Sequence, residues 1–210
     1  MKTILAAVLI LLFGGWAVYT QTDGLTVLTT EAARRQAIVR QPAALPDARM
    51  ELADGSQPML ADILEDDGRI AIVNFMFTRC TSVCIQMADE FQQLQAAIRK
   101  QGLQDRVRLI SISFDPRDTA EWLGRYQKRM QADPAIWQAV LAVEDDARKQ
   151  LLERFGIIVV PAPLGQFEHN TAYHVVTADG HLTRIVDIDN ADVVLYYAAR
   201  QSGRTEAPLS

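Results

Sequence analysis

Apolar residues along the chain fall into short continuous runs and longer stretches with helical spacing. Three short runs are apolar at most positions. In a strand, successive side chains point to opposite faces, so these runs predict strands that are buried on both faces of a sheet. These runs span 69–77, 107–114 and 137–143. After the first run, Phe91, Leu94 and Ile98 recur at intervals of three or four residues, which predicts an amphipathic helix. Strands that alternate with helices indicate an α/β fold.

Capping residues mark the ends of the predicted helices. The first helix follows Cys84 and ends before Gly102, because glycine is typical of helix C-termini. The second begins at Asp118 or Thr119, whose side chains suit helix N-termini, and the third covers 144–155 after an acidic start. The apolar face of the second helix, expected to lie in the core, consists of Trp122, Leu123, Tyr126 and Met130.

Turn signals mark both ends of the predicted domain. A short hairpin with its turn at Gly55 is expected to open it. Near its end, two strands joined at Asp179-Gly180 precede a closing helix at 190–203. Together these elements predict a three-layer α/β fold, with a mixed central sheet flanked by helices.

The amino terminus has the pattern of an export signal. Lys2 is followed by twenty uncharged residues, which are strongly apolar from Ile4 to Tyr19. We expect 1–22 to be an uncleaved hydrophobic anchor, and a cleaved signal is the alternative. In the anchored form, the domain lies on the outer, periplasmic side of the inner membrane.

The rest of the chain divides by composition into three segments. Residues 23–49 are polar and end in a proline-containing turn, so we interpret them as a tether with a short helix at 31–39. The globular domain is expected at 50–202, and a flexible tail at 203–210.

Composition and charge exclude some partners. The chain has 210 residues, of which 49% are hydrophobic and 22% charged, enough for one globular domain with a real core. Its 21 Lys and Arg against 26 Asp and Glu give a net charge of -5, and no long basic run is present. A nucleic-acid partner is therefore not expected.

The chain contains two cysteines, Cys80 and Cys84, between a predicted buried strand and the helix that follows. They can form one disulfide, one metal site, one redox pair or two buried thiols. The start of a helix and the adjacent Arg79 both stabilise thiolate. A spacing of four residues lets both sulfurs share a soft ion such as Cu(I), or close a disulfide if the turn is not fully helical.

Three histidines are candidates for a further role. His169 follows a proline-rich segment and precedes a strand, so we expect it on a loop, where functional residues concentrate. His174 lies in the middle of a predicted strand and His181 in a hairpin, and we expect structural roles for both. Asp115, at the end of a strand, is either a turn residue or a carboxylate that tunes a nearby site.

Three segments resemble one known family when taken together. The segment FMFTRCTSVCIQMADEFQQLQ resembles the cysteine segment of the SCO/SenC family, SFDPRDT resembles its Asp-Pro element, and HNTAYHVVTADG resembles its histidine element. The resemblance covers roughly residues 50 to 200. The chain resembles a divergent member of that family, because Thr81 and Ile85 stand where the family usually has proline, and Arg79 replaces a common histidine.

The resemblance implies a thioredoxin-like fold and a copper metallochaperone. It implies that Cys80, Cys84 and His169 bind copper, as Cu(I) or Cu(II), with Asp115 and Arg79 beside the site. The strand after His169 would then run antiparallel to the central strands and begin near Cys80. The implied partner is the copper-acceptor subunit of cytochrome c oxidase, served by a membrane-tethered monomer.

Other functions remain open at this stage. In the main alternative, the chain is an exported thiol-disulfide oxidoreductase, in which Cys80 attacks and Cys84 resolves, and which keeps the acceptor's cysteines reduced. A peroxidase is a third reading, and a binding module with only a structural disulfide between Cys80 and Cys84 is the fourth.

Overall fold

The computed structural model describes residues 10, 13–16, 30–65, 67–80 and 83–205, excluding the side chains of 30, 83–88, 204 and 205. The chain divides into two compact units, 1–41 and 42–210. The first contains helix α2 (Thr30–Arg40), close to the short helix predicted at 31–39. The predicted anchor at 1–22 lies outside the described residues, apart from 10 and 13–16. No helix among the described residues is long and apolar enough to cross a membrane.

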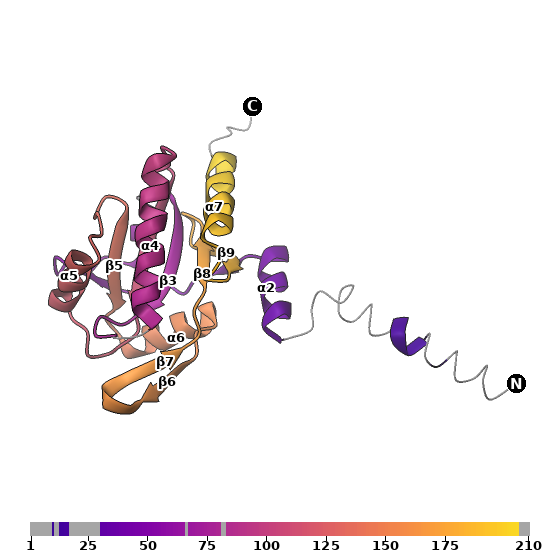
Figure 1. Cartoon of the computed structure of the whole chain (residues 1–210), viewed down its shortest axis with the longest axis horizontal. Coiled ribbons are helices and arrows are strands. Elements are labelled where there is room, and N and C mark those ends of the chain that lie inside the picture. The colour runs from indigo at the N-terminus through magenta and orange to yellow at the C-terminus, as the bar shows by residue number, and fades with distance from the viewer. Residues whose placement is uncertain (1–9, 11–12, 17–29, 66, 81–82, 206–210) are drawn as a thin grey trace, which may run out of the picture. The chain divides into compact units, whose positions relative to one another are not determined.

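The second unit is built on a mixed seven-stranded sheet, with strand order β1-β9-β8-β3-β4-β5-β2 (Figure 1). Its central strands β3, β4 and β5 are parallel, whereas β8 runs antiparallel to β3. A separate hairpin pairs β6 with β7. The strands are β1 (Ala43–Ala44), β2 (Met50–Leu52), β3 (Ile70–Met76), β4 (Val107–Ser113), β5 (Trp137–Ala142), β6 (Val159–Ala162), β7 (Gln166–His169), β8 (Tyr173–Val176) and β9 (His181–Val186).

Helices cover both faces of the sheet. One face carries α4, α5 and α7, whose apolar residues join those of the strands in one core cluster, and α4 and α7 lie side by side in Figure 1. The other face carries α3 and α6. The helices are α3 (Leu60–Glu65), α4 (Val83–Lys100), α5 (Ala120–Arg129), α6 (Asp145–Phe155), the short η1 (Pro163–Gly165) and α7 (Ala191–Thr205).

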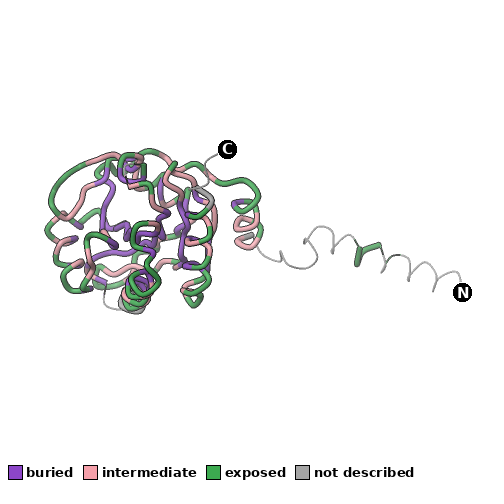
Figure 2. The backbone as a smooth tube through the Cα atoms, turned by 90° about the horizontal axis from the view of Figure 1, so that it is seen from above, coloured by how far each residue is buried: buried purple, intermediate pink, exposed green. Residues whose placement is uncertain are grey.

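Aromatic side chains fill both layers between sheet and helices. Beneath α4, the ring of Phe91 lies 5.4 Å from that of Trp137 and 6.0 Å from that of Tyr173. On the other face, the rings of Phe75 and Phe155 meet edge to face at 5.0 Å. Figure 2 shows that buried backbone positions concentrate in the strands between these layers. All seven residues of β3 and of β4 are buried, as expected for central strands of an α/β sheet.

The predicted short hairpin after Met50 is present. The chain turns at Gly55, the N–H of Leu52 donates to the carbonyl of Ser56, and the N–H of Met50 donates to the carbonyl of Pro58. The first strand of this hairpin, β2, also pairs with β5. The structure departs from the predictions at two places. The compact unit begins at Pro42, earlier than the predicted Met50, because β1 pairs with β9. The second departure, at β6 and β7, concerns the site.

Candidate functional site

The Cys80 loop, residues 77–80, leaves the end of β3 beside the end of β4. The backbone N–H of Cys80 donates to the carbonyl of Phe77 at 3.3 Å, and Cys80 is only 7% exposed. Helix α4 begins at Val83, so Cys84 lies in its first turn. The side chain of Cys84 lies outside the described residues, and the predicted disulfide with Cys80 and the joint metal site therefore remain predictions.

Asp118 anchors the Cys80 loop from the segment after β4. Its carboxylate accepts from the backbone N–H of Thr78 at 2.8 Å, from the Thr78 hydroxyl at 2.6 Å and from the Ser113 hydroxyl at 2.6 Å. The side chain of Asp118 is completely buried, and Arg79 approaches it at 3.7 Å. These three hydrogen bonds satisfy donors that are themselves buried, and a buried donor without an acceptor is costly. Asp118 thus fixes the backbone two residues before Cys80.

Asp115 forms a second buried anchor next to Asp118. Arg79 Nη2 lies 3.0 Å from Asp115 Oδ2, and Arg117 donates from Nε and Nη2 at 2.8 Å each. Burial alone would raise the pKa of Asp115, but the hydrogen bonds from Arg117 and the charges of Arg117 and Arg79 outweigh it and hold that pKa below its ordinary value. Asp115 is therefore a carboxylate at neutral pH and holds Arg79 beside Cys80.

Trp122 belongs to this surface and not to the core, contrary to the prediction from helical spacing. It is half-buried, whereas Leu123 and Tyr126 of the same helix are fully buried. The guanidinium of Arg79 lies 5.8 Å from the centre of the Trp122 ring, and that of Arg125 lies 4.9 Å from it. Trp122 thus makes cation–π contacts with two guanidinium groups, one of them from Arg79 of the Cys80 loop.

His169 lies on a strand, so its predicted position on a loop is wrong. It is the last residue of β7 and pairs with Val159 of β6. The imidazole packs against the ring of Phe114 with centroids 4.8 Å apart, and Nδ1 lies 3.0 Å from the carbonyl oxygen of Asn170. Because a carbonyl only accepts, Nδ1 carries the proton, and Nε2 carries the lone pair that a metal would use.

The surroundings of His169 lower its pKa. Burial lowers this pKa below the ordinary value of 6.5, while the hydrogen bond to Asn170 and the charge at Cys80 act in the opposite direction. The imidazole is therefore neutral at pH 7. The packing of Phe167, two residues before His169, on Phe77 of the Cys80 loop at 5.2 Å brings these two segments together.

The lowered pKa of His169 predicts a pH dependence of stability. As pH falls through 6.5, the unfolded chain takes up a proton at this position that the folded chain resists, so the free energy of unfolding should decrease. Above that pH the contribution vanishes. We expect NMR titration of the imidazole to give a pKa below 6.5, and His169→Gln to remove this part of the pH dependence. A value at or above 6.5 would contradict the burial of this ring.

The other two histidines lie away from Cys80. His174, in the middle of β8 as predicted, is 1% exposed and packs edge to face with Phe75 and Phe155. His181 opens β9 and pairs with Asp179 at 3.3 Å. Since β8 runs antiparallel to β3, the turn between β8 and β9 lies at the end of β3 opposite to Cys80.

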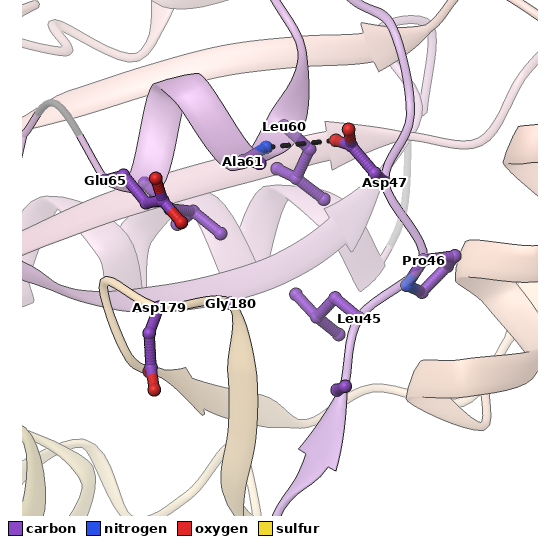
Figure 3. Close-up of a pocket in the computed structure, with 10 residues that line it drawn as sticks. Leu45, Pro46, Asp47, Leu60, Ala61, Glu65, Asp179 and Gly180 are labelled. Carbon is purple, nitrogen blue, oxygen red and sulfur yellow. Dashed lines mark hydrogen bonds between the residues drawn. The ribbon is translucent and has the colours of Figure 1, made fainter.

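A pocket at that opposite end is not the candidate site. It encloses about 100 Å³ and is lined by β1, α3 and the turn between β8 and β9 (Figure 3). Asp47, on its wall, accepts hydrogen bonds from the backbone N–H groups of Ala48 and Ala61, which ties the β1 segment to the start of α3. Among the described side chains, no three or more Cys, His, Asp and Glu lie close enough to hold a metal ion. The side chain of Cys84 is not among the described side chains.

Two residues of the site were not predicted. Asp118 was expected only as a possible helix cap, a position that Thr119 takes instead, and Arg117 was not considered. The signal for both is the short segment Asp-Pro-Arg-Asp-Thr, in which charged residues crowd the end of a buried strand. Such charges need partners. Here Asp118 finds its partner on the Cys80 loop, and Arg117 finds its partners at Asp115 and on the β6–β7 hairpin.

Solved structures share this arrangement of strands and helices. A SCO1/SenC family lipoprotein from Bacillus anthracis superposes with a TM-score of 0.67 at 22% identity, over 80% of this chain and 99% of the other. BsSco, a Sco family cytochrome c oxidase assembly protein with a disulfide switch, superposes with a TM-score of 0.65 at 22% identity, over 78% of this chain and 95% of the other. Arabidopsis thaliana ScoI with copper bound superposes with a TM-score of 0.63 at 19% identity, over 76% of this chain and 99% of the other.

These likenesses confirm the predicted thioredoxin-like fold with its mixed sheet flanked by helices. No match was found among curated proteins. The family model described as SCO1/SenC matches residues 59–200, which is more than half of the chain and includes the Cys80 loop, both buried aspartates and His169. The chain therefore belongs to the SCO1/SenC family.

Proposed function

We propose that this protein binds copper through Cys80, Cys84 and His169 and delivers it to the copper centre of cytochrome c oxidase. Family membership and the copper-bound structure of Arabidopsis thaliana ScoI support this function. The oxidase as destination is supported by BsSco, which belongs to a family of oxidase assembly proteins. An exported, membrane-tethered location rests on the apolar segment at 1–22 and is consistent with the lipoprotein from Bacillus anthracis.

The observation that carries the proposal is the aromatic packing that joins the segment of His169 to the Cys80 loop, because Phe114 lies 4.8 Å from the His169 ring. His169 and Cys80 are far apart in sequence, and the aromatic rings of Phe77 and Phe114 connect their segments, with centroids 5.4 Å apart. Nδ1 of the neutral imidazole donates its proton to the Asn170 carbonyl oxygen, so the lone pair of Nε2 is the one available to a metal ion. A thiolate and an imidazole together suit copper in both oxidation states.

Each residue has a distinct part in this mechanism. Cys80 and Cys84 supply the thiolates, which Cu(I) prefers, and His169 supplies the nitrogen ligand. Arg79, held by Asp115, places a positive charge beside Cys80 and favours its thiolate form. The start of α4 lies at the edge of the sheet, where an acceptor's ligands can replace these one by one.

A variant of His169 tests the ligand set. We expect His169→Ala to lower copper affinity by about 10- to 100-fold or more, because removal of a ligand costs at least as much as loss of an outer-shell partner. Affinity is measured by competition with a copper chelator, on the full-length chain, reduced and under anaerobic conditions. His181→Ala is the matched control, since His181 lies at the opposite end of β3, and it should leave affinity unchanged. Wild-type affinity in His169→Ala would refute the three-ligand site.

A second function is favoured by one comparison. BsSco has a disulfide switch, so a cysteine pair on this fold can cycle between thiol and disulfide. In this chain, the same reading makes Cys80 the attacking thiolate and Cys84 the resolving thiol of an oxidoreductase. The two functions differ in whether the reduced chain holds copper.

A further inference from the structure

The hairpin that carries His169 is not part of the main sheet. Its strands β6 and β7 pair only with each other in a two-stranded sheet, and Figure 1 shows the hairpin projecting from the domain below β8. At its tip, Leu164 is 98% exposed, and Leu164 and Gly165 both have positive φ. Side-chain contacts, and not strand pairing, must therefore set the position of His169 relative to Cys80.

Arg117 makes the main polar contact with this hairpin. Its Nη2 donates to the carbonyl oxygen of Gly165 at 2.8 Å, and its guanidinium lies 5.2 Å from the centre of the Phe167 ring. Phe167 also packs edge to face against Phe77 and Phe114, with ring centroids 5.2 and 5.6 Å away. Arg117 thus contacts both the tip of the hairpin and Phe167, which packs on the segments that follow β3 and β4.

Arg117 is itself held rigidly at the edge of the sheet. Its backbone N–H and its guanidinium both donate to Asp115, the carboxylate that also binds Arg79 next to Cys80. One guanidinium therefore connects the carboxylate beneath the Cys80 loop with the hairpin that carries His169. The amide of Gln166 adds a weaker contact to the Arg79 carbonyl at 3.4 Å.

Gly165 is shaped to receive Arg117. Its φ of +70° disfavours residues with a side chain, and a Cβ at this position would lie 3.0 Å from Arg117 Nη1. A side chain at this position would therefore strain the turn and crowd the guanidinium. Gly165 thus leaves room for the Arg117 guanidinium and also accepts its hydrogen bond.

We propose that Arg117 is a positioning residue, which holds the His169 hairpin against the Cys80 loop and so aligns the imidazole with the thiol. Arg117 touches neither Cys80 nor His169 in this role and acts through Asp115, Gly165 and Phe167. The consequence for copper rests on the proposed function, but the clamp itself does not.

Hydrogen exchange on the metal-free, full-length chain tests the clamp directly. In Arg117→Gln, the backbone amides of β6 and β7 should exchange about tenfold faster or more, while those of β3 and β4 stay unchanged, because charge-assisted hydrogen bonds to the hairpin are lost. Arg117→Lys should restore protection only in part, since an ammonium cannot contact Asp115 and Gly165 with the same fork. Arg200→Gln, which removes an exposed guanidinium that donates to the Tyr196 hydroxyl on α7, is the matched control and should change nothing.

Gly165→Ala tests the same contact from the hairpin side. It should also speed exchange in β6 and β7, and its effect should be smaller in the Arg117→Gln background, where the clash with the guanidinium is gone. Equal effects in both backgrounds, or unchanged hairpin exchange in Arg117→Gln, would overturn the clamp.

Copper binding tests whether the clamp aligns the site. Arg117→Gln should weaken copper affinity by about 10- to 100-fold with Cys80, Cys84 and His169 all present. Faster hairpin exchange with unchanged affinity would overturn the aligning role. If the wild-type chain holds no copper, the proposed function fails, and the exchange result still decides whether Arg117 positions the hairpin.

Discussion

Replacement of Cys80 by serine is expected to abolish tight copper binding by the full-length chain. Serine keeps the size of the side chain, but its hydroxyl is a hard, neutral ligand that does not replace a thiolate for Cu(I). Cys80 is buried and is the only cysteine whose side chain the structure describes, so no other described thiolate can take its place. The loss should exceed the roughly 100-fold that removal of an outer-shell partner can cost.

Competition with a copper chelator under reducing, anaerobic conditions measures this loss. Cys84→Ser should behave in the same way if both thiolates bind one ion. Circular dichroism of each variant checks that the fold is retained. Tight binding that survives in Cys80→Ser would mean that copper sits elsewhere, and the assignment of this edge of the sheet would be wrong.

Replacement of Asp118 by alanine is expected to lower the free energy of unfolding by about 3 kcal/mol or more. The carboxylate accepts from the Thr78 N–H, the Thr78 hydroxyl and the Ser113 hydroxyl, and all three donors are buried. Alanine would leave them without an acceptor in a place that water does not reach. Urea unfolding, followed by fluorescence and circular dichroism, gives the change.

Glu121→Gln is the control for Asp118. It removes the carboxylate of a surface ion pair with Arg125, in which the side chain of Glu121 is 71% exposed. Surface pairs of this kind contribute little, and the change should stay within about 0.5 kcal/mol. A comparably small change in Asp118→Ala would show that the Thr78 and Ser113 contacts do not stabilise the Cys80 loop.

The strands and helices of the main sheet were predictable because their signals are local. The run at 69–77 is apolar on both faces, and it forms the central strand β3. The helix after Cys84 ends with Gly102 at positive φ, where glycine was expected as a cap. Each of these elements depends on residues within one stretch of chain, so periodicity and capping suffice to find it.

The β6–β7 hairpin was missed because its composition is typical of a loop. Pro161, Pro163 and Gly165 disfavour regular strands, yet a two-stranded hairpin tolerates proline where no neighbouring strand needs its N–H. His169 was therefore predicted as a candidate residue but in the wrong kind of element. The packing of Phe167 on Phe77 and Phe114, which makes the hairpin possible, joins distant segments.

The residues that support the site were harder to predict than the candidate ligands. Cys80 and Asp115 stand at the ends of adjacent parallel strands, so their proximity follows from strand order. Arg117 and Asp118 act through partners that lie on the Cys80 loop and on the hairpin. Their roles depend on which loops meet at the edge of the sheet, and no local pattern reveals that.

The copper content of the wild-type chain tests the central claim most directly. The full-length protein, fully reduced and kept under anaerobic conditions, is loaded with Cu(I), separated from excess metal and analysed for copper per chain. The account predicts one tightly held copper ion per chain. A chain that retains none would contradict it and would leave the dithiol of Cys80 and Cys84 as the functional group, as in the oxidoreductase.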